Sequence, residues 1–141
     1  MNNWLFYAIL SALFAAFTAI LAKVGVKDVN SNLATAIRTI VILLFAWGIV
    51  FFQCTQKQLS HIDKGSLVFL ILSGIATGLS WLFYFRALQL GEASRVSPID
   101  KLSLVLTIVL AAVLLKEKVT LPIVIGTVLM TVGAMLIGFG K

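Results

Sequence analysis

Five long apolar runs follow one another along the chain, separated by short polar stretches. Each run holds about 20 residues, the length that an α-helix needs to cross the hydrocarbon core of a bilayer. The pattern therefore predicts an all-α membrane protein, a single bundle of five transmembrane helices within residues 1–141. The expected spans are about residues 4–22, 33–52, 66–90, 96–115 and 121–139.

Small residues gather on one side of two predicted spans. In the last span Gly126 and Gly133 lie seven residues apart, and Thr127, Thr131, Ala134 and Gly138 continue the same face. The first span has a similar arc, made of Ala8, Ser11, Ala12, Ala15, Thr18, Ala19 and Ala22. Because small residues let helix backbones approach closely in lipid, we expect the face of the first span to pack inward. We expect the face of the last span to be a helix contact, within the chain or between chains.

The third span combines glycine with aromatic and hydroxyl side chains. Its stripe consists of Gly74, Gly78, Trp81 and Phe85, and beside it lie Thr77, Ser80 and Tyr84. The stripe predicts close packing next to a cavity wall. Trp81 and Tyr84 fit either core packing or a substrate site.

Charged residues occur inside the predicted spans, at Arg38, Arg86, Asp100 and Lys101. A charge in hydrocarbon costs several kcal/mol unless it is paired, hydrated or snorkelling, so such residues are functional candidates. Following the alternation of span ends, these four and Lys23 fall at one membrane level. Arg38 fits snorkelling or a cavity role, and Arg86 fits the interface.

Asp100 and Lys101 stand about one turn inside the fourth span when 20 residues are counted back from Leu115. Ser97, Pro98 and Asp100 fit the N-cap, N1 and N3 positions of a helix, where an acid complements the dipole. The alternative is a substrate or proton role, with Ser103 and Thr107 on the same face as Asp100. Lys101 would oppose the dipole, so we expect it to snorkel, and adjacent positions do not favour its pairing with Asp100.

Composition narrows the functional classes. The chain is 61% hydrophobic and 11% charged, and its net charge of +6 comes from single Lys and Arg residues at the ends of apolar runs. This scatter favours lipid headgroups over nucleic acid as the partner. Cys54 and His61 are single, so we expect no disulfide within the chain, no metal site and no cofactor. The absence of a nucleophile and base constellation argues against an enzyme.

The loop charges are balanced across the membrane. One side carries Lys23, Lys27, Arg95 and Lys141, and the other carries Lys57, Lys64, Lys116 and Lys118. The positive-inside rule reads such a tie as no strong preference. Counting the embedded Arg38, Arg86 and Lys101 would favour the charged end facing the cytoplasm. Insertion in both orientations is therefore a hypothesis.

An ordered set of motifs in the second half of the chain resembles a known family. The set comprises Ser80-Trp-Leu-Phe-Tyr-Phe-Arg-Ala-Leu-Gln-Leu-Gly91, Ala93-Ser94, Val96-Ser-Pro98, Pro-Ile-Asp-Lys-Leu-Ser at 98–103, and Glu117 before a span with Gly126 and Gly133. It resembles the EamA module of the drug/metabolite transporter superfamily, in its five-helix single-module branch.

The resemblance implies one half of a ten-helix inverted-repeat transporter. A lone module would pair with an antiparallel copy of itself or with a sister module, in the cell (inner) membrane, and carry a small solute by alternating access. The related small multidrug exporters use a Gly-x6-Gly dimer contact similar to Gly126 and Gly133. They also use a Glu in helix one, whereas this first span has no acid. Many EamA modules have a second proline where this chain has Leu104, so the resemblance alone does not predict a kink in span four.

Three functions remain open. The first is a transporter of a small metabolite or drug-like solute, and the positive end of the protein favours solutes with a carboxylate or phosphate. The second is a proton-coupled exporter of hydrophobic cations, in which Asp100 would titrate. The third is a non-transporting membrane subunit of a larger carrier.

Overall fold

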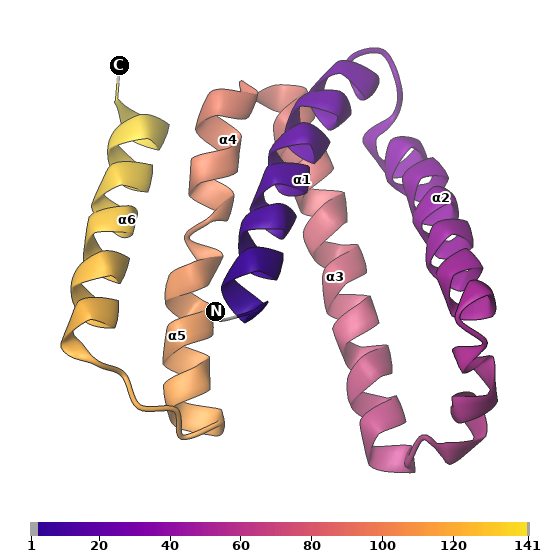
Figure 1. Ribbon diagram of the computed structural model, residues 1–141. Helices are drawn as coiled ribbons and strands as arrows, with labels where there is room; N and C mark the ends of the chain where they lie inside the picture. The colour runs from indigo at the N-terminus through magenta and orange to yellow at the C-terminus, as the bar shows by residue number, and fades with distance from the viewer. Residues whose placement is uncertain (1–2, 141) are drawn as a thin grey trace. The chain divides into compact units, whose positions relative to one another are not determined.

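A computed structural model describes residues 3–140, which contain five helical regions long and apolar enough to cross a membrane (Figure 1). They are α1 (Asn3–Gly25), α2 (Ser31–Phe52), α3 (Lys64–Leu90), the pair α4 (Ala93–Asp100) and α5 (Ser103–Leu114), and α6 (Leu121–Phe139). A short 3₁₀ helix, η1 (Thr55–His61), connects α2 to α3. No strand occurs in residues 3–140. The predicted all-α fold with five spans is confirmed.

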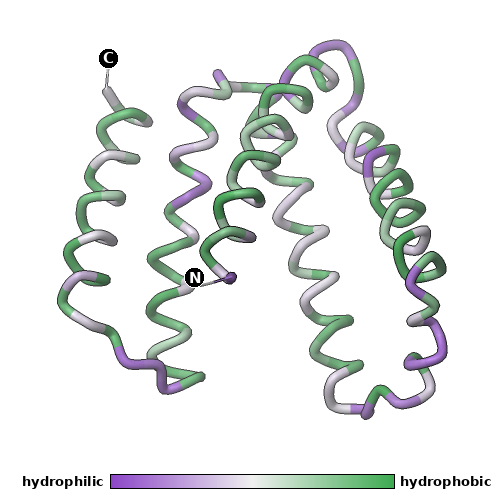
Figure 2. Tube along the Cα trace, in the orientation of Figure 1, coloured by the Kyte–Doolittle hydropathy of each residue, from purple (hydrophilic) through white to green (hydrophobic). Residues whose placement is uncertain are grey.

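The helix ends differ little from the expected ones, except in the fourth span. α6 has the predicted bounds, whereas α1 extends to Gly25 and α4 begins at Ala93. The fourth span is interrupted after Asp100, so that two helices share one run of 22 residues. In Figure 2 a hydrophilic stretch marks this interruption, and α5, which follows it, is largely apolar.

The chain divides into two compact units, which we describe separately. Unit 1 comprises Met1–Ile20 with Leu90–Lys141, and unit 2 comprises Leu21–Gln89. Lys141, which entered the prediction of balanced loop charge, lies outside the described residues.

Unit 2 packs most tightly at the end where the α1–α2 linker meets the end of α3. Val26 and Leu88 are fully buried, and Phe85 is buried with them. Two polar residues of α2, Ser31 and Thr35, are also buried, and the Thr35 hydroxyl donates to the Ser31 carbonyl at 2.9 Å. This local bond satisfies the hydroxyl, which would otherwise cost free energy when removed from water.

Side chains cap the starts of both long helices in unit 2. The Asn30 side chain accepts hydrogen bonds from the backbone N–H groups of Asn32 and Leu33, at 2.9 and 3.4 Å. At the start of α3 the Asp63 carboxylate accepts from the Ser66 N–H at 2.8 Å. Because the first N–H groups of a helix have no partner within it, these side chains set where α2 and α3 begin.

Unit 1 is held by packing of α4 against α6. A Cβ added to Gly138 would lie 2.7 Å from Cγ1 of Ile99, so a larger residue there would force the isoleucine side chain to shift. Ala134, one turn earlier on α6, is buried. α5 also contacts α6.

Few hydrophobic side chains are buried in residues 3–140, considering the length of the apolar runs. The buried ones are Ala19, Val26, Phe85, Leu88 and Ala134. The small-residue arc of α1 is buried at Ala19, while Ala8, Ser11, Ala12 and Ala15 are exposed. Most of the apolar surface is therefore left for lipid or for further protein contacts, as expected for membrane-spanning helices.

Candidate functional site

Arg38 is the charged side chain best placed to act on a ligand in unit 2. It lies seven residues after Ser31 on α2 and shares a helix face with the buried Ser31 and Thr35. Its Cζ is 4.4 Å from the ring centroid of Trp81 and 5.1 Å from that of Phe85. The guanidinium therefore lies against two rings of α3.

Trp81 and Phe85 stand one turn apart on α3, and the guanidinium of Arg38 lies over both rings. Phe85 is 2% exposed, which fixes its ring, and Trp81 is half-buried. Cation–π contacts of this kind contribute about 0.5–2 kcal/mol, more when they are shielded from water. They hold the charge without using its N–H donors.

The other predicted site residues of α3 are Tyr84, Thr77 and Ser80. Tyr84 is half-buried, and its ring meets that of Phe85 edge to face at 6.3 Å. Thr77 and Ser80 are exposed, and the Thr77 hydroxyl donates to the Ser73 carbonyl at 2.9 Å. Within unit 2 the structure thus brings Arg38 and Trp81 together, while the roles of Tyr84, Thr77 and Ser80 stay predictions.

Gly74 and Gly78 continue the stripe of α3 beyond Trp81. A Cβ added to either glycine would meet no atom within 4 Å. The close helix approach expected at these glycines is therefore not made by neighbours in the structure. Both glycines therefore face open space along α3.

Asp100 and Lys101 of unit 1 stand at the break in span four, and the capping interpretation of Asp100 is wrong. α4 begins after the N-cap Glu92, so Pro98 lies inside the helix and Asp100 is its last residue. A helix C-terminus attracts cations and repels anions. Lys101, at the C-cap, therefore complements the dipole and Asp100 opposes it, the reverse of the prediction.

The two charges also pair with each other, which the sequence did not lead us to expect. The Lys101 Nζ is 3.5 Å from Oδ2 of Asp100, with the side chains 56% and 35% exposed. Asp100 lies seven residues past Ala93, about two helical turns into the span, deeper than the one turn predicted. The turn between the helices lets the two adjacent side chains meet.

The break itself needs no second proline. Lys101 N–H bonds to the carbonyls of Ser97 and Pro98, and Leu102 N–H bonds to that of Ile99 at 3.0 Å. This tightening to 3₁₀ geometry ends α4, and Ser103 then opens α5. Ser103 is exposed, and its carbonyl accepts from the Thr107 hydroxyl at 2.9 Å.

The small-residue face of α6 is in fact two faces. Ala134 is buried and Gly138 meets Ile99 of α4. Gly126 and Gly133 face a different direction, where an added Cβ would meet nothing within 4 Å. One face thus packs inside unit 1, while the Gly126 and Gly133 face is open in the structure.

Sequence reasoning did not find the polar cluster that ties the α1–α2 linker to α3. Gln89 donates from Nε2 to the carbonyls of Val26 and Val29, at 3.2 and 2.9 Å, and accepts from Arg86 at 2.7 Å. Lys23 donates to the Leu88 carbonyl at 2.6 Å. The sequence feature that could have indicated this cluster is the polar Gln89 next to the end of an apolar span.

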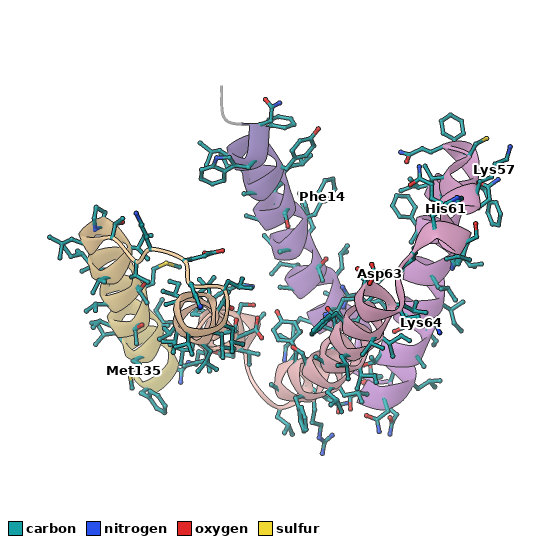
Figure 3. The ribbon with its side chains drawn as sticks, turned by 90° about the horizontal axis from the view of Figure 1, so that it is seen from below. Phe14, Lys57, His61, Asp63, Lys64 and Met135 are labelled. Carbon is teal, nitrogen blue, oxygen red and sulfur yellow. The ribbon has the colours of Figure 1, made fainter. Side chains whose placement is uncertain are left out.

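A cavity of about 640 Å³ lies where α2 passes into η1. Oε1 of Gln56, one of its lining residues, is buried without a hydrogen-bond partner in the part of the chain described. Figure 3 shows Lys57 and His61 on η1, and Asp63 and Lys64 where α3 begins. The lining residues are Trp47, Val50, Thr55, Gln56, Gln58, Leu59, His61 and Ile62.

Residues 3–140 contain no group of three or more His, Cys, Asp or Glu side chains that could hold a metal ion. Asp63, in the loop before α3, accepts hydrogen bonds that change its pKa. A hydrogen bond from the Ser66 side chain, followed by one from its backbone amide, lowers the pKa of the Asp63 carboxyl below its ordinary value.

Comparison with known proteins places the chain in a family. The model of the EamA-like transporter family matches residues 2–139. A protein of Sinorhizobium sp. named "Uncharacterized transporter in cobO 3'region" is 48% identical over 136 residues, which cover 96% of each chain. An uncharacterised protein of Methanocaldococcus jannaschii is 32% identical over 85 residues, covering 60% of this chain and 62% of that one. No solved structure was found to match.

The family match covers residues 2–139, and this range includes all five helical regions that are long and apolar enough to cross a membrane. The resemblance seen in the motifs of the second half of the chain is thereby confirmed. The chain belongs to the EamA-like transporter family, and the protein is a multi-pass membrane transporter.

Proposed function

We propose that the protein carries a small metabolite or drug-like solute across the cell (inner) membrane by alternating access. The working unit is a dimer of five-helix modules, formed by two antiparallel copies or by this chain with a sister module. The observation that carries the proposal is the family match across residues 2–139 in a chain that holds five spans.

The odd number of spans supports pairing in opposite orientations. Two copies that insert oppositely reproduce an inverted repeat, the plan on which many carriers are built. The Sinorhizobium relative named as a transporter matches this chain over 96% of its own length, so it too is about one module long. A single module of this kind supplies half of the surface that would enclose a solute.

The Gly126 and Gly133 face of α6 supports a contact with a second module. Glycines on a membrane helix allow close backbone approach, yet nothing fills the space next to these two. The break between α4 and α5 supports the transport mechanism, because interrupted helices near the solute path are common in carriers.

Transport is tested by reconstituting the purified protein in liposomes. A thermal-shift screen in detergent first selects solutes, because a bound solute stabilises the folded state by mass action. We expect the selected solutes to cross loaded liposomes with the protein and not those without it. Stable dimers that move none of the solutes would contradict the proposal and favour a non-transporting subunit.

Dimer formation is tested with matched glycine variants. We expect Gly133→Leu to shift the protein from dimer to monomer, measured by light scattering in detergent. Gly48→Leu, which also points into open space on another helix, should leave the dimer intact. A dimer that survives Gly126→Leu and Gly133→Leu together would exclude this face as the contact.

Orientation is tested by labelling a cysteine placed at position 140 in intact cells, after Cys54→Ser removes the native thiol. Dual insertion predicts that a membrane-impermeant maleimide labels about half of the molecules. Labelling of all or none would instead assign one orientation, and a sister module would then have to supply the inverted partner.

A further inference from the structure

Arg38 carries a charge inside a membrane span without an acidic partner among the described residues of its own unit. The ion pairs found in residues 3–140 are Glu92 with Arg95 and Asp100 with Lys101, both in unit 1. Arginines in spans almost always pair or face water. Arg38 lies over the rings of Trp81 and Phe85 and interacts electrostatically with Tyr84, and the ring contacts do not use its five N–H donors.

The surroundings of Arg38 place its guanidinium against the rings of α3. α2 is fixed next to it by the buried Ser31 and Thr35, and the ring of Phe85 is buried. Beyond Trp81, Gly78 leaves open space along α3. A planar guanidinium that is oriented by stacking and has free edges is suited to bind a carboxylate or phosphate through two parallel hydrogen bonds.

We propose that Arg38, stacked on Trp81 and Phe85, is the group that binds the oxyanion of a ligand, and that the transported solutes carry a carboxylate or phosphate. This inference rests on the proposed transport function. The same chemistry is present in a phospholipid headgroup, so the experiment separates a soluble oxyanion from a lipid phosphate.

The test measures how strongly iodide quenches the fluorescence of Trp81 at equilibrium. Trp4→Phe and Trp47→Phe leave Trp81 as the single tryptophan. A nearby positive charge should raise the local iodide concentration about fivefold, the factor given by an attraction of about 1 kcal/mol. We therefore expect Arg38→Gln to lower iodide quenching about fivefold, and Arg38→Lys to keep most of it.

Two controls separate charge from folding and access. Quenching by neutral acrylamide should be the same with and without Arg38→Gln. In a second background, Trp4→Phe with Trp81→Phe, the remaining Trp47 stacks near Phe51 and not on an arginine. Its quenching by iodide should not respond to Arg38→Gln.

Competition then identifies the source of the oxyanion. In maltoside micelles, which carry no phosphate, inorganic phosphate or acetate at millimolar concentration should suppress the iodide quenching of Trp81. The suppression should persist in vesicles if the ligand is a solute. If phosphatidylglycerol suppresses quenching and soluble anions do not, the oxyanion is that of a lipid.

Three results would overturn the proposal. The first is iodide quenching that is equal with and without the Arg38→Gln substitution, and the second is quenching that no oxyanion reduces. The third is quenching that appears only after Asp100→Asn, because Arg38 would then be neutralised by the protein's own acid. Since binding is measured without flux, any of these would leave the transport proposal standing, whereas normal binding without flux would contradict transport alone.

Discussion

Both units place charged side chains within a membrane span, but they stabilise them by different means. In unit 2 Arg38 reaches across to α3 and stacks on rings more than 40 residues further along the chain. In unit 1 Asp100 and Lys101 pair with each other where their own helix is broken. The ring contacts of Arg38 do not use its N–H donors. Asp100 and Lys101 instead offset each other's charge in an ion pair.

The two units also differ in what holds their helices together. Unit 2 combines buried apolar side chains with long-range hydrogen bonds from Lys23 and Gln89 to backbone carbonyls. Unit 1 depends on close contact between α4 and α6, with a backbone break beside it. We therefore expect the linker end of unit 2 to be more rigid than the region around the break in unit 1.

The largest expected effect is on the apolar centre of unit 2. Leu88→Ala removes a side chain that is fully buried, and should lower the free energy of unfolding by roughly 2–5 kcal/mol. Denaturant unfolding in mixed micelles measures it. Leu90→Ala, two residues away and 73% exposed, is the control and should change little. Equal effects of the two substitutions would mean that unit 2 is not centred on Leu88.

The polar tie between the linker and α3 should contribute less. Gln89→Leu leaves the carbonyls of Val26 and Val29 without their side-chain donor, at a cost of about 1–3 kcal/mol. Unfolding measures the loss, and proteolysis should cut the linker between α1 and α2 faster. Gln53→Leu, at the exposed other end of α2, is the matched control. An unchanged rate of linker cleavage would show that Gln89 does not restrain it.

The charges at the break in span four should matter little for stability. Asp100→Asn removes a partly exposed ion pair and an acid that opposes the helix dipole, so the net change should be below about 1 kcal/mol. A clear loss of stability would restore a structural role for Asp100. If solute flux falls while the unfolding free energy stays unchanged, Asp100 acts in transport.

The smallest expected effect concerns the Asp63 cap of α3. Hydrogen bonds from Ser66 lower the pKa of Asp63 in the folded state. The charged cap therefore stabilises the start of α3 fully when the pH is above the ordinary pKa of an aspartate, about 4. The contribution is lost as pH falls through the folded pKa. Hydrogen exchange at the Ser66 amide should therefore become faster, relative to exchange at neighbouring amides, once the pH falls below the folded pKa of Asp63. Asp63→Asn should abolish this pH dependence. If the variant still shows it, the pH dependence arises from another titratable group.

Span positions could be predicted closely from the sequence, and the environment of the charges could not. The spans follow from run length alone, because about 20 apolar residues are needed to cross a bilayer. The capping role of Asp100 was wrong because Ser97-Pro98 resembles a helix start whether or not a helix has already begun at Ala93. Which of several local hydrogen-bond patterns forms depends on the packing of α4 against α6.

The sequence by itself determined the membrane location, the five spans and the family, because apolar length and ordered motifs are properties of the chain alone. Tertiary structure decided that Arg38 stacks on Trp81 and Phe85, that Gln89 holds the linker, and that Asp100 pairs with Lys101 at a break. No periodic pattern in the sequence links the residues that make these contacts. They form only when backbone hydrogen bonding and helix packing bring the side chains together.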